Sequence, residues 1–141
     1  MRSKTKSFIY LSIIILVVAF LFIVVTQVKD KKRREENKLY NKLNDIVLTY
    51  YKDYYYKTVL GSDDSLRKSN ASNLSKNGIK ITLNQLANYK GDEKNTILDE
   101  FKNYKTNTPC DYDKTIIMIY PREPYGDQDI RIESTIECGI K

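Results

Sequence analysis

The sequence has no histidine and no tryptophan, and its 141 residues include only five glycines, three prolines and two cysteines. Without an imidazole, histidine-based catalytic triads, histidine metal sites and imidazole acid-base catalysis are excluded. The few glycines are scattered over turns and form no phosphate-binding motif. We therefore predict that the protein is not an enzyme and uses no cofactor.

An excess of charge of one sign is also missing. The chain has 24 lysines and arginines and 18 aspartates and glutamates, which leaves a net charge of +6. A mixed, mildly basic surface of this kind favours solubility and weak attraction to anionic lipid or wall polymer, and lacks the concentrated positive charge of a nucleic-acid interface. We predict no nucleic-acid partner.

The longest apolar run covers residues 8–28, and it contains no charged residue. As a helix it would be about 30 Å long, which is the thickness of the hydrocarbon core of a bilayer. It is too long for a signal peptide, and the sequence VVTQVK at its end has no small-x-small cleavage site. We predict a retained transmembrane helix, preceded by a short basic leader or cytoplasmic flank at residues 1–7.

Residues 29–60 predict an amphipathic continuation of this helix. Apolar residues recur there at steps of three and four and form a stripe that we expect to pack against a sheet: Leu39, Leu43, Ile46, Val47, Tyr50 and Tyr54. No proline or glycine occurs before Gly61, so nothing in the sequence forces a break. The alternative is a membrane anchor, a flexible charged hinge at residues 30–38, and a separate helix.

The rest of the chain predicts a surface loop and a small head, so the fold class is α+β. Residues 61–78 are rich in Ser, Asn, Asp and Gly, which is typical of a loop. The head, residues 79–141, begins with a short strand and a capping box at Thr82 and Gln85 that opens a short helix. A second helix is expected near residues 92–104, followed by an antiparallel hairpin of strands 115–120 and 129–138.

The two cysteines, Cys110 and Cys138, lie just before the first hairpin strand and at the end of the second. These positions are neighbours in an antiparallel pair, so we predict a disulfide bond and place the head outside the cytoplasm. The basic residues that follow the apolar run favour the opposite topology under the positive-inside rule, with the head in the cytoplasm.

An apolar helix with an amphipathic second half, a variable loop, a short sheet and a C-terminal cysteine pair together resemble type IV pilins and pseudopilins. The runs ITLNQLANYKGD, TPCDYDKTIIMIYP and IRIESTIECG are similar to the C-terminal layout of small pilin-like proteins. The resemblance implies a minor structural subunit of a type IV pilus, competence or type II secretion-like assembly. Its partners would be the membrane and other pilin-like subunits, which it contacts through the N-terminal helix.

The chain departs from the family at its processing motif. Ser7 stands where the family has a glycine before the phenylalanine, here Phe8, and Ser12 stands where it has a glutamate. The resemblance implies cleavage between Ser7 and Phe8, and the missing glutamate favours an initiating or tip subunit over a repeating one. The alternative function is a single-pass, membrane-anchored extracytoplasmic binding or accessory protein.

Two further groups of residues are weaker candidates for a site. Asp127 and Asp129, like Asp111 and Asp113, form an Asp-x-Asp pair in a turn and are candidate calcium ligands. Aspartates in turns more often bind their own backbone, so we predict no metal site. Five tyrosines lie between residues 50 and 56; packing accounts for most of them, and Tyr55 and Tyr56 are candidates for contact with a neighbouring subunit.

Overall fold

The structure is a computed structural model that describes the backbone of residues 2–139 and the side chains of residues 13–91 and 93–139. It has the predicted α+β class: a long N-terminal helix and a three-stranded antiparallel sheet. The chain divides into two compact units, residues 1–38 and 39–141. Each unit is described by itself.

Residues 2–38 of the first unit are helical and belong to α1, which begins at Arg2 and ends at Tyr50. Its apolar side chains from Ile13 to Val28 are 40 to 71% exposed, and the helix is long and apolar enough to span a membrane. Residues 30–38, which the alternative prediction made a hinge, are helical, and ion pairs one turn apart stabilise them: Asp30–Arg33, Lys32–Glu36 and Glu35–Lys38.

The second unit begins with the last turns of α1 and continues into η1, a π-helix from Tyr51 to Val59. Leu43, Val47 and Tyr51 are fully buried and lie four residues apart, as on one face of an α-helix. The next buried residue is Tyr56, five positions further on. In an α-helix residue i+5 lies about 140° around the axis from residue i, so the wider π turn is what returns Tyr56 to the core.

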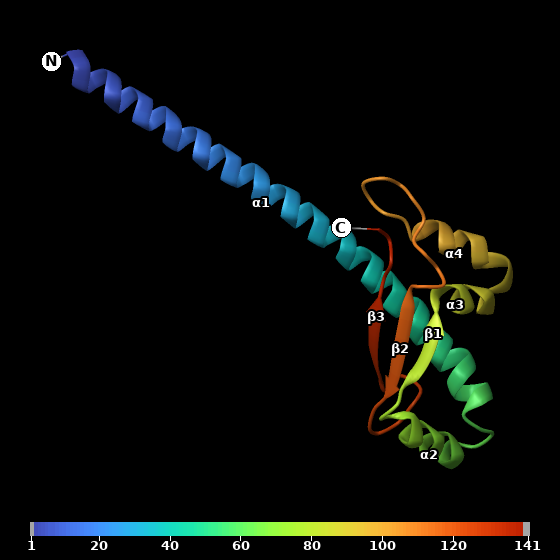
Figure 1. The fold of residues 1–141 in the computed structure, drawn as a ribbon. Helices are drawn as coiled ribbons and strands as arrows, with labels where there is room; N and C mark the ends of the chain where they lie inside the picture. The colour runs from blue at the N-terminus through green and yellow to red at the C-terminus, as the bar shows by residue number, and fades with distance from the viewer. Residues whose placement is uncertain (1, 140–141) are drawn as a thin grey trace. The chain divides into compact units, whose positions relative to one another are not determined.

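The sheet has the order β1-β2-β3, with β1 at Ile79–Thr82, β2 at Ile116–Pro121 and β3 at Ile130–Thr135 (Figure 1). The predicted hairpin of β2 and β3 is confirmed. Its register aligns Ile79, Ile119 and Ile132 across the three strands, and β3 alternates between half-buried and exposed residues as its sequence predicts. A row of isoleucines therefore crosses all three strands on one face of the sheet.

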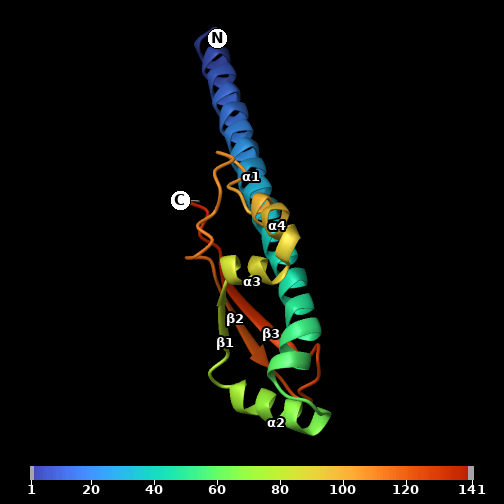
Figure 2. The same cartoon turned by 90° about the vertical axis from the view of Figure 1, so that its right-hand side faces the viewer.

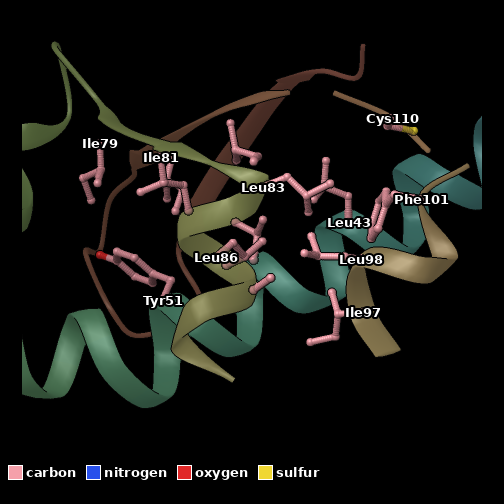
Figure 3. Packing of buried hydrophobic residues seen from close by; sticks show 14 of the residues in the cluster. Leu43, Tyr51, Ile79, Ile81, Leu83, Leu86, Ile97, Leu98, Phe101 and Cys110 are labelled. Carbon is pink, nitrogen blue, oxygen red and sulfur yellow. The ribbon is translucent and has the colours of Figure 1, made fainter. Parts of the chain in front are cut away.

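The segment of α1 from Leu39 onward runs along one face of this sheet (Figures 1 and 2). A single cluster of buried side chains fills the space between them, and Figure 3 shows Leu43, Ile81, Leu83 and Leu98 converging there from α1, β1, α3 and α4. The sheet residues Ile117 and Ile119 belong to the same cluster. The predicted packing of the helix stripe in the core is thus correct for Leu43 and Val47, with Leu39, Ile46 and Tyr50 partly buried at its edge.

Two short helices connect β1 to β2. The first, α3 (Leu83–Tyr89), has the predicted capping box: Gln85 N donates to the Thr82 hydroxyl, and Thr82 N donates to Gln85 Oε1. A 3-10 turn, η2 (Gly91–Glu93), leads into α4 (Lys94–Glu100). The predicted second helix is therefore too long, because Phe101 leaves the helical conformation to bury its ring.

The prediction that residues 61–78 form a loop is wrong, because they contain α2 (Asp64–Leu74). Two of the polar residues that predicted a loop stabilise this helix instead: the Asp63 carboxylate caps it by accepting from Leu66 N at 2.9 Å, and Asn70 Nδ2 ties it to the preceding segment by donating to Leu60 O at 2.6 Å. Gly78 follows with φ +69°, where a side chain would collide with the ring of Tyr120. Caps and tertiary contacts override the weak helix propensity of Ser and Asn here.

The predicted disulfide between Cys110 and Cys138 is present, and hydrogen bonds hold the chain on both sides of it. Asn103 is buried, and its Nδ2 donates to the carbonyl of Cys138 at 3.0 Å. The hydroxyl of buried Thr115 accepts from Glu137 N at 3.1 Å. The chain after β3 is thereby attached to the segments that precede β2.

Replacing both cysteines by serine should lower the free energy of unfolding by about 3 to 4 kcal/mol, because the bond closes a loop between residues 28 positions apart. Denaturant titration of the full chain in detergent micelles, followed by circular dichroism, measures this. The parent protein reduced with dithiothreitol is the control, and its free energy of unfolding should fall by a similar amount. A double variant as stable as the parent would show that the hydrogen bonds alone hold this segment.

Leu43→Ala should lower the free energy of unfolding by about 2 to 5 kcal/mol, because the Leu43 side chain is fully buried where α1 packs in the core. Leu66→Ala is the matched control: this leucine is 44% exposed on α2, and its truncation should cost well under 1 kcal/mol. The same denaturant titration reads both. Equal losses would contradict the placement of the core against α1.

Candidate functional site

The tyrosines between residues 50 and 56 separate into two groups where α1 gives way to the π-helix. Tyr51 and Tyr56 are buried, and Tyr54 is 38% exposed. Two predictions are thereby corrected: Tyr54 is not part of the buried stripe, and Tyr56 is not available to a neighbouring subunit. Tyr56 instead donates its hydroxyl hydrogen bond to Asp64 of α2 at 3.2 Å.

Tyr50 and Tyr54 lie beside Tyr89 at the end of α3, and the three rings form one cluster. The ring centroid of Tyr89 is 5.2 Å from that of Tyr50, nearly edge-to-face at 81°, and 5.2 Å from that of Tyr54. Tyr50 and Tyr54 are 5.5 Å apart. These are favourable aromatic distances, so the rings hold one another in place.

These three rings and the side chains of Gln85 and Asn88 line an open cavity of about 400 Å³, called the tyrosine pocket below. Every lining residue lies in the second unit. Gln85 and Asn88 are exposed at its rim. The pocket is therefore a small concave surface of aromatic faces and carboxamides, with no charged side chain among its lining residues.

The helix α3, which carries three of the five lining residues of this pocket, is fixed at its start. Its capping box is described above, and Leu83 N donates to Thr115 O at 3.0 Å. Asn84 Nδ2 donates to the carboxylate of Asp113 at 2.9 Å. These bonds tie α3 to the segment before β2, so Gln85, Asn88 and Tyr89 are held on a rigid support.

Burial changes the acidity of these tyrosines. Loss of contact with water, with smaller effects of Tyr54, Tyr55 and Tyr89, raises the pKa of Tyr50 to about 12. Burial also raises the pKa of Tyr51, and the nearby carboxylates of Asp129 and Asp127 add to that rise. Tyrosine hydroxyl groups are neutral at physiological pH in any case, so these shifts in pKa affect the protein only above about pH 9.

One aspartate of each pair, Asp111 or Asp129, binds the backbone of its own turn, and Asp113 binds Asn84 of α3. Asp111 accepts from Lys114 N at 3.0 Å and forms an ion pair with its ammonium group, which lowers the pKa of the Asp111 carboxyl. Asp129 accepts from Gly126 N at 2.8 Å. Among the side chains that the structure describes, no three acidic, cysteine or histidine residues gather as a metal site would require. The calcium candidates Asp127 and Asp129 gain no support from this geometry.

Of the remaining predicted site residues, the cysteines lie in the part of the chain whose side chains the structure describes, and the processing site does not. Cys110 and Cys138 meet as predicted. The predicted processing site, Ser7 and Phe8, has side chains outside the described residues, as does Ser12. Sequence reasoning identified Tyr50 and Tyr54 as notable but missed Gln85, Asn88 and Tyr89. The only available signal was the periodicity of α3, which indicates its buried face and not its exposed one.

No protein-family model, no curated protein sequence and no solved structure matches this chain. The resemblance to pilins therefore stays a prediction from the sequence.

Tyr50→Phe should flatten the alkaline loss of stability. A tyrosine in the unfolded chain ionises near pH 10, whereas Tyr50 in the folded protein keeps its proton until about pH 12. The unfolded state therefore binds fewer protons over this window, so stability falls as pH rises from 10 to 12 and is unaffected below pH 9. Free energies of unfolding measured at each pH should show a shallower fall in the variant.

The control for this measurement is Tyr40→Phe, which removes a hydroxyl group from an exposed ring on the same helix. Its pH profile should follow that of the parent. Identical profiles for Tyr50→Phe and the parent would contradict the burial of the Tyr50 hydroxyl group.

Proposed function

We propose that the protein is a minor pilin- or pseudopilin-like structural subunit that is anchored by residues 8–28 and presents its α+β head outside the cytoplasm. The observation that supports this best is the dual use of α1. Its N-terminal part carries exposed apolar side chains at Ile13–Val28, and its C-terminal part supplies Leu43 and Val47 to the core of the head. One helix therefore carries both a segment that is long and apolar enough to span a membrane and part of the core of a folded domain.

The cysteine pair supports the extracytoplasmic side. Disulfides persist in oxidising compartments and are rare in the cytoplasm. Both cysteines are buried next to backbone hydrogen bonds that depend on their position, such as Cys110 N to Phe101 O at 2.9 Å. The bond is thus part of the head's architecture, which outweighs the seven basic residues between Lys29 and Lys42 as an indicator of topology.

The second candidate function is a membrane-anchored extracytoplasmic accessory protein that does not assemble. Ser7 and Ser12 favour it, because they replace the glycine and glutamate of the pilin processing motif. The two functions share the anchor and the head and differ in whether residues 1–7 are removed.

Intact-mass measurement of the protein purified from membranes of its own cells separates the two. A pilin-like subunit should lack residues 1–7 and begin at Phe8 with an N-methyl group, and Ser7→Gly should be cleaved at least as completely. Ser7→Lys, a matched change at the same position, should stay full-length because a bulky charge does not fit a peptidase that expects a small residue. An uncleaved chain in both the parent and Ser7→Gly would contradict the pilin proposal and favour the plain anchor.

A further inference from the structure

We propose that the tyrosine pocket binds neutral, β-linked carbohydrate. The pocket lies entirely within the second unit, residues 39–141, and is defined by Tyr50, Tyr54, Gln85, Asn88 and Tyr89. This inference does not depend on assembly into a filament, because it concerns a site that a single chain completes.

The shape of the pocket suits a small organic ligand with a flat apolar face. Its volume of about 400 Å³ lies within the usual range for ligand sites, about 300 to 1,000 Å³. Tyr54 is the most accessible of the three rings at 38% exposure, although tyrosine is a residue that normally buries much of its ring. Pyranose rings with equatorial hydroxyl groups present axial C–H bonds to such a ring, and β-linked sugars keep this face flat along the chain.

The rim supplies the hydrogen bonds that sugar hydroxyls need. Asn88 offers a carboxamide with two N–H donors and one acceptor oxygen. The Oε1 atom of Gln85 accepts from Thr82 N, so in the proposed complex its Nε2 group is the part of this carboxamide that would donate to the ligand. The lining side chains are tyrosines and carboxamides, so at physiological pH the pocket presents neutral donors and acceptors of both kinds. Hydroxyl groups can donate and accept, so they match this mixture.

The charges around the pocket disfavour a cationic ligand. Aromatic cages for ammonium groups rely on open ring faces and commonly on a nearby carboxylate. Here the Lys90 ammonium group already lies 5.9 Å from the ring centroid of Tyr89, and no aspartate or glutamate lines the cavity. A neutral ligand avoids repulsion from Lys90 and needs no countercharge.

The backbone at the pocket is also unusual in a way that fits a binding site. Tyr54 lies in the nine-residue π-helix, and π segments occur frequently at functional sites. The i→i+5 bond from Leu60 N to Tyr55 O, at 3.0 Å, belongs to this segment. The wide turn keeps Tyr51 and Tyr56 in the core while Tyr54 remains at the surface beside Tyr89. Since α3 is tied down on the other side, the pocket is formed before a ligand arrives, which lowers the entropic cost of binding.

The test is a titration of the full-length, isotope-labelled protein with cellobiose and with N,N′-diacetylchitobiose, followed through the side-chain amide signals of Asn88 and Gln85. The micelle should be made of a detergent without a sugar headgroup, because a glucoside or maltoside would itself occupy the site. At least one disaccharide should shift these signals saturably, with a Kd of about 1 mM or lower.

Tyr54→Ala should weaken this binding about fivefold to tenfold, because it removes the exposed stacking face. Tyr40→Ala is the matched control: Tyr40 is 37% exposed, close to the 38% of Tyr54, and lies outside the pocket, so its loss should change the Kd less than about twofold. Asn88→Ala is a second variant, which should also weaken binding and leaves the rings intact. Gln85 is left unchanged because it caps α3.

Three results would overturn the proposal. The first is the absence of a saturable shift with either sugar up to about 20 mM. The second is equal weakening by Tyr54→Ala and Tyr40→Ala. The third is a saturable shift with a polyproline peptide and none with the sugars, which would assign the pocket to a protein partner. None of these results bears on whether residues 1–7 are removed, so the failure of this inference and that of the proposed function can be told apart.

Discussion

The folded head depends on the burial of one helical face, formed by Leu43, Val47 and Tyr51, against the isoleucines of a three-stranded sheet. A sheet of this size cannot cover its own apolar face, and the two helices between β1 and β2 are each only seven residues long. The C-terminal part of α1 therefore provides the cover for the apolar face of the sheet, and no other element of the head could provide it. A small core of this kind leaves little margin of stability, which gives the disulfide and the hydrogen bonds around Asn103 and Thr115 their importance.

Regular periodicity predicted the parts of the fold that obey it. Leu43 and Val47 repeat at helical spacing, β3 alternates residue by residue, and Thr82 with Gln85 forms a local cap that needs no tertiary information. The predictions failed where the backbone departs from regular α-helical spacing, and where side-chain hydrogen bonds outweigh composition. The π-helix adds a residue to the turn and so separates Tyr54 from the buried face. In α2, the Asp63 carboxylate caps the first turn and the Asn70 carboxamide binds Leu60 O, and these bonds stabilise a helix whose composition is that of a loop.

The candidate site shows the same limit at longer range. The pairing of Cys110 with Cys138 follows from the geometry of a hairpin, and the tyrosines near residue 50 are visible as a local cluster. Tyr89, Gln85 and Asn88 lie more than 30 positions after Tyr50 in the sequence, and nothing in their spacing links them to it. They meet Tyr50 and Tyr54 through the tertiary structure. Hydrogen bonds hold α3 against the segment before β2, and in that position Tyr89 packs against the end of α1 and η1.

The anchor raises a separate question of driving force. Lipid tails are as apolar as the side chains of Ile13–Val28, so burying these side chains against other helices within a bilayer gains little hydrophobic free energy. Association of helices in lipid depends instead on close packing and on polar contacts. The apolar run offers few of either: its small or polar residues are Tyr10, Ser12, Ala19, Thr26 and Gln27, and the hydroxyl of Thr26 already donates to Ile23 O at 2.8 Å. In the proposed assembly the anchor would therefore hold the subunit in place, and the selection of neighbours would depend on the head. That division suits a subunit present in few copies at a defined position better than one that repeats along a filament.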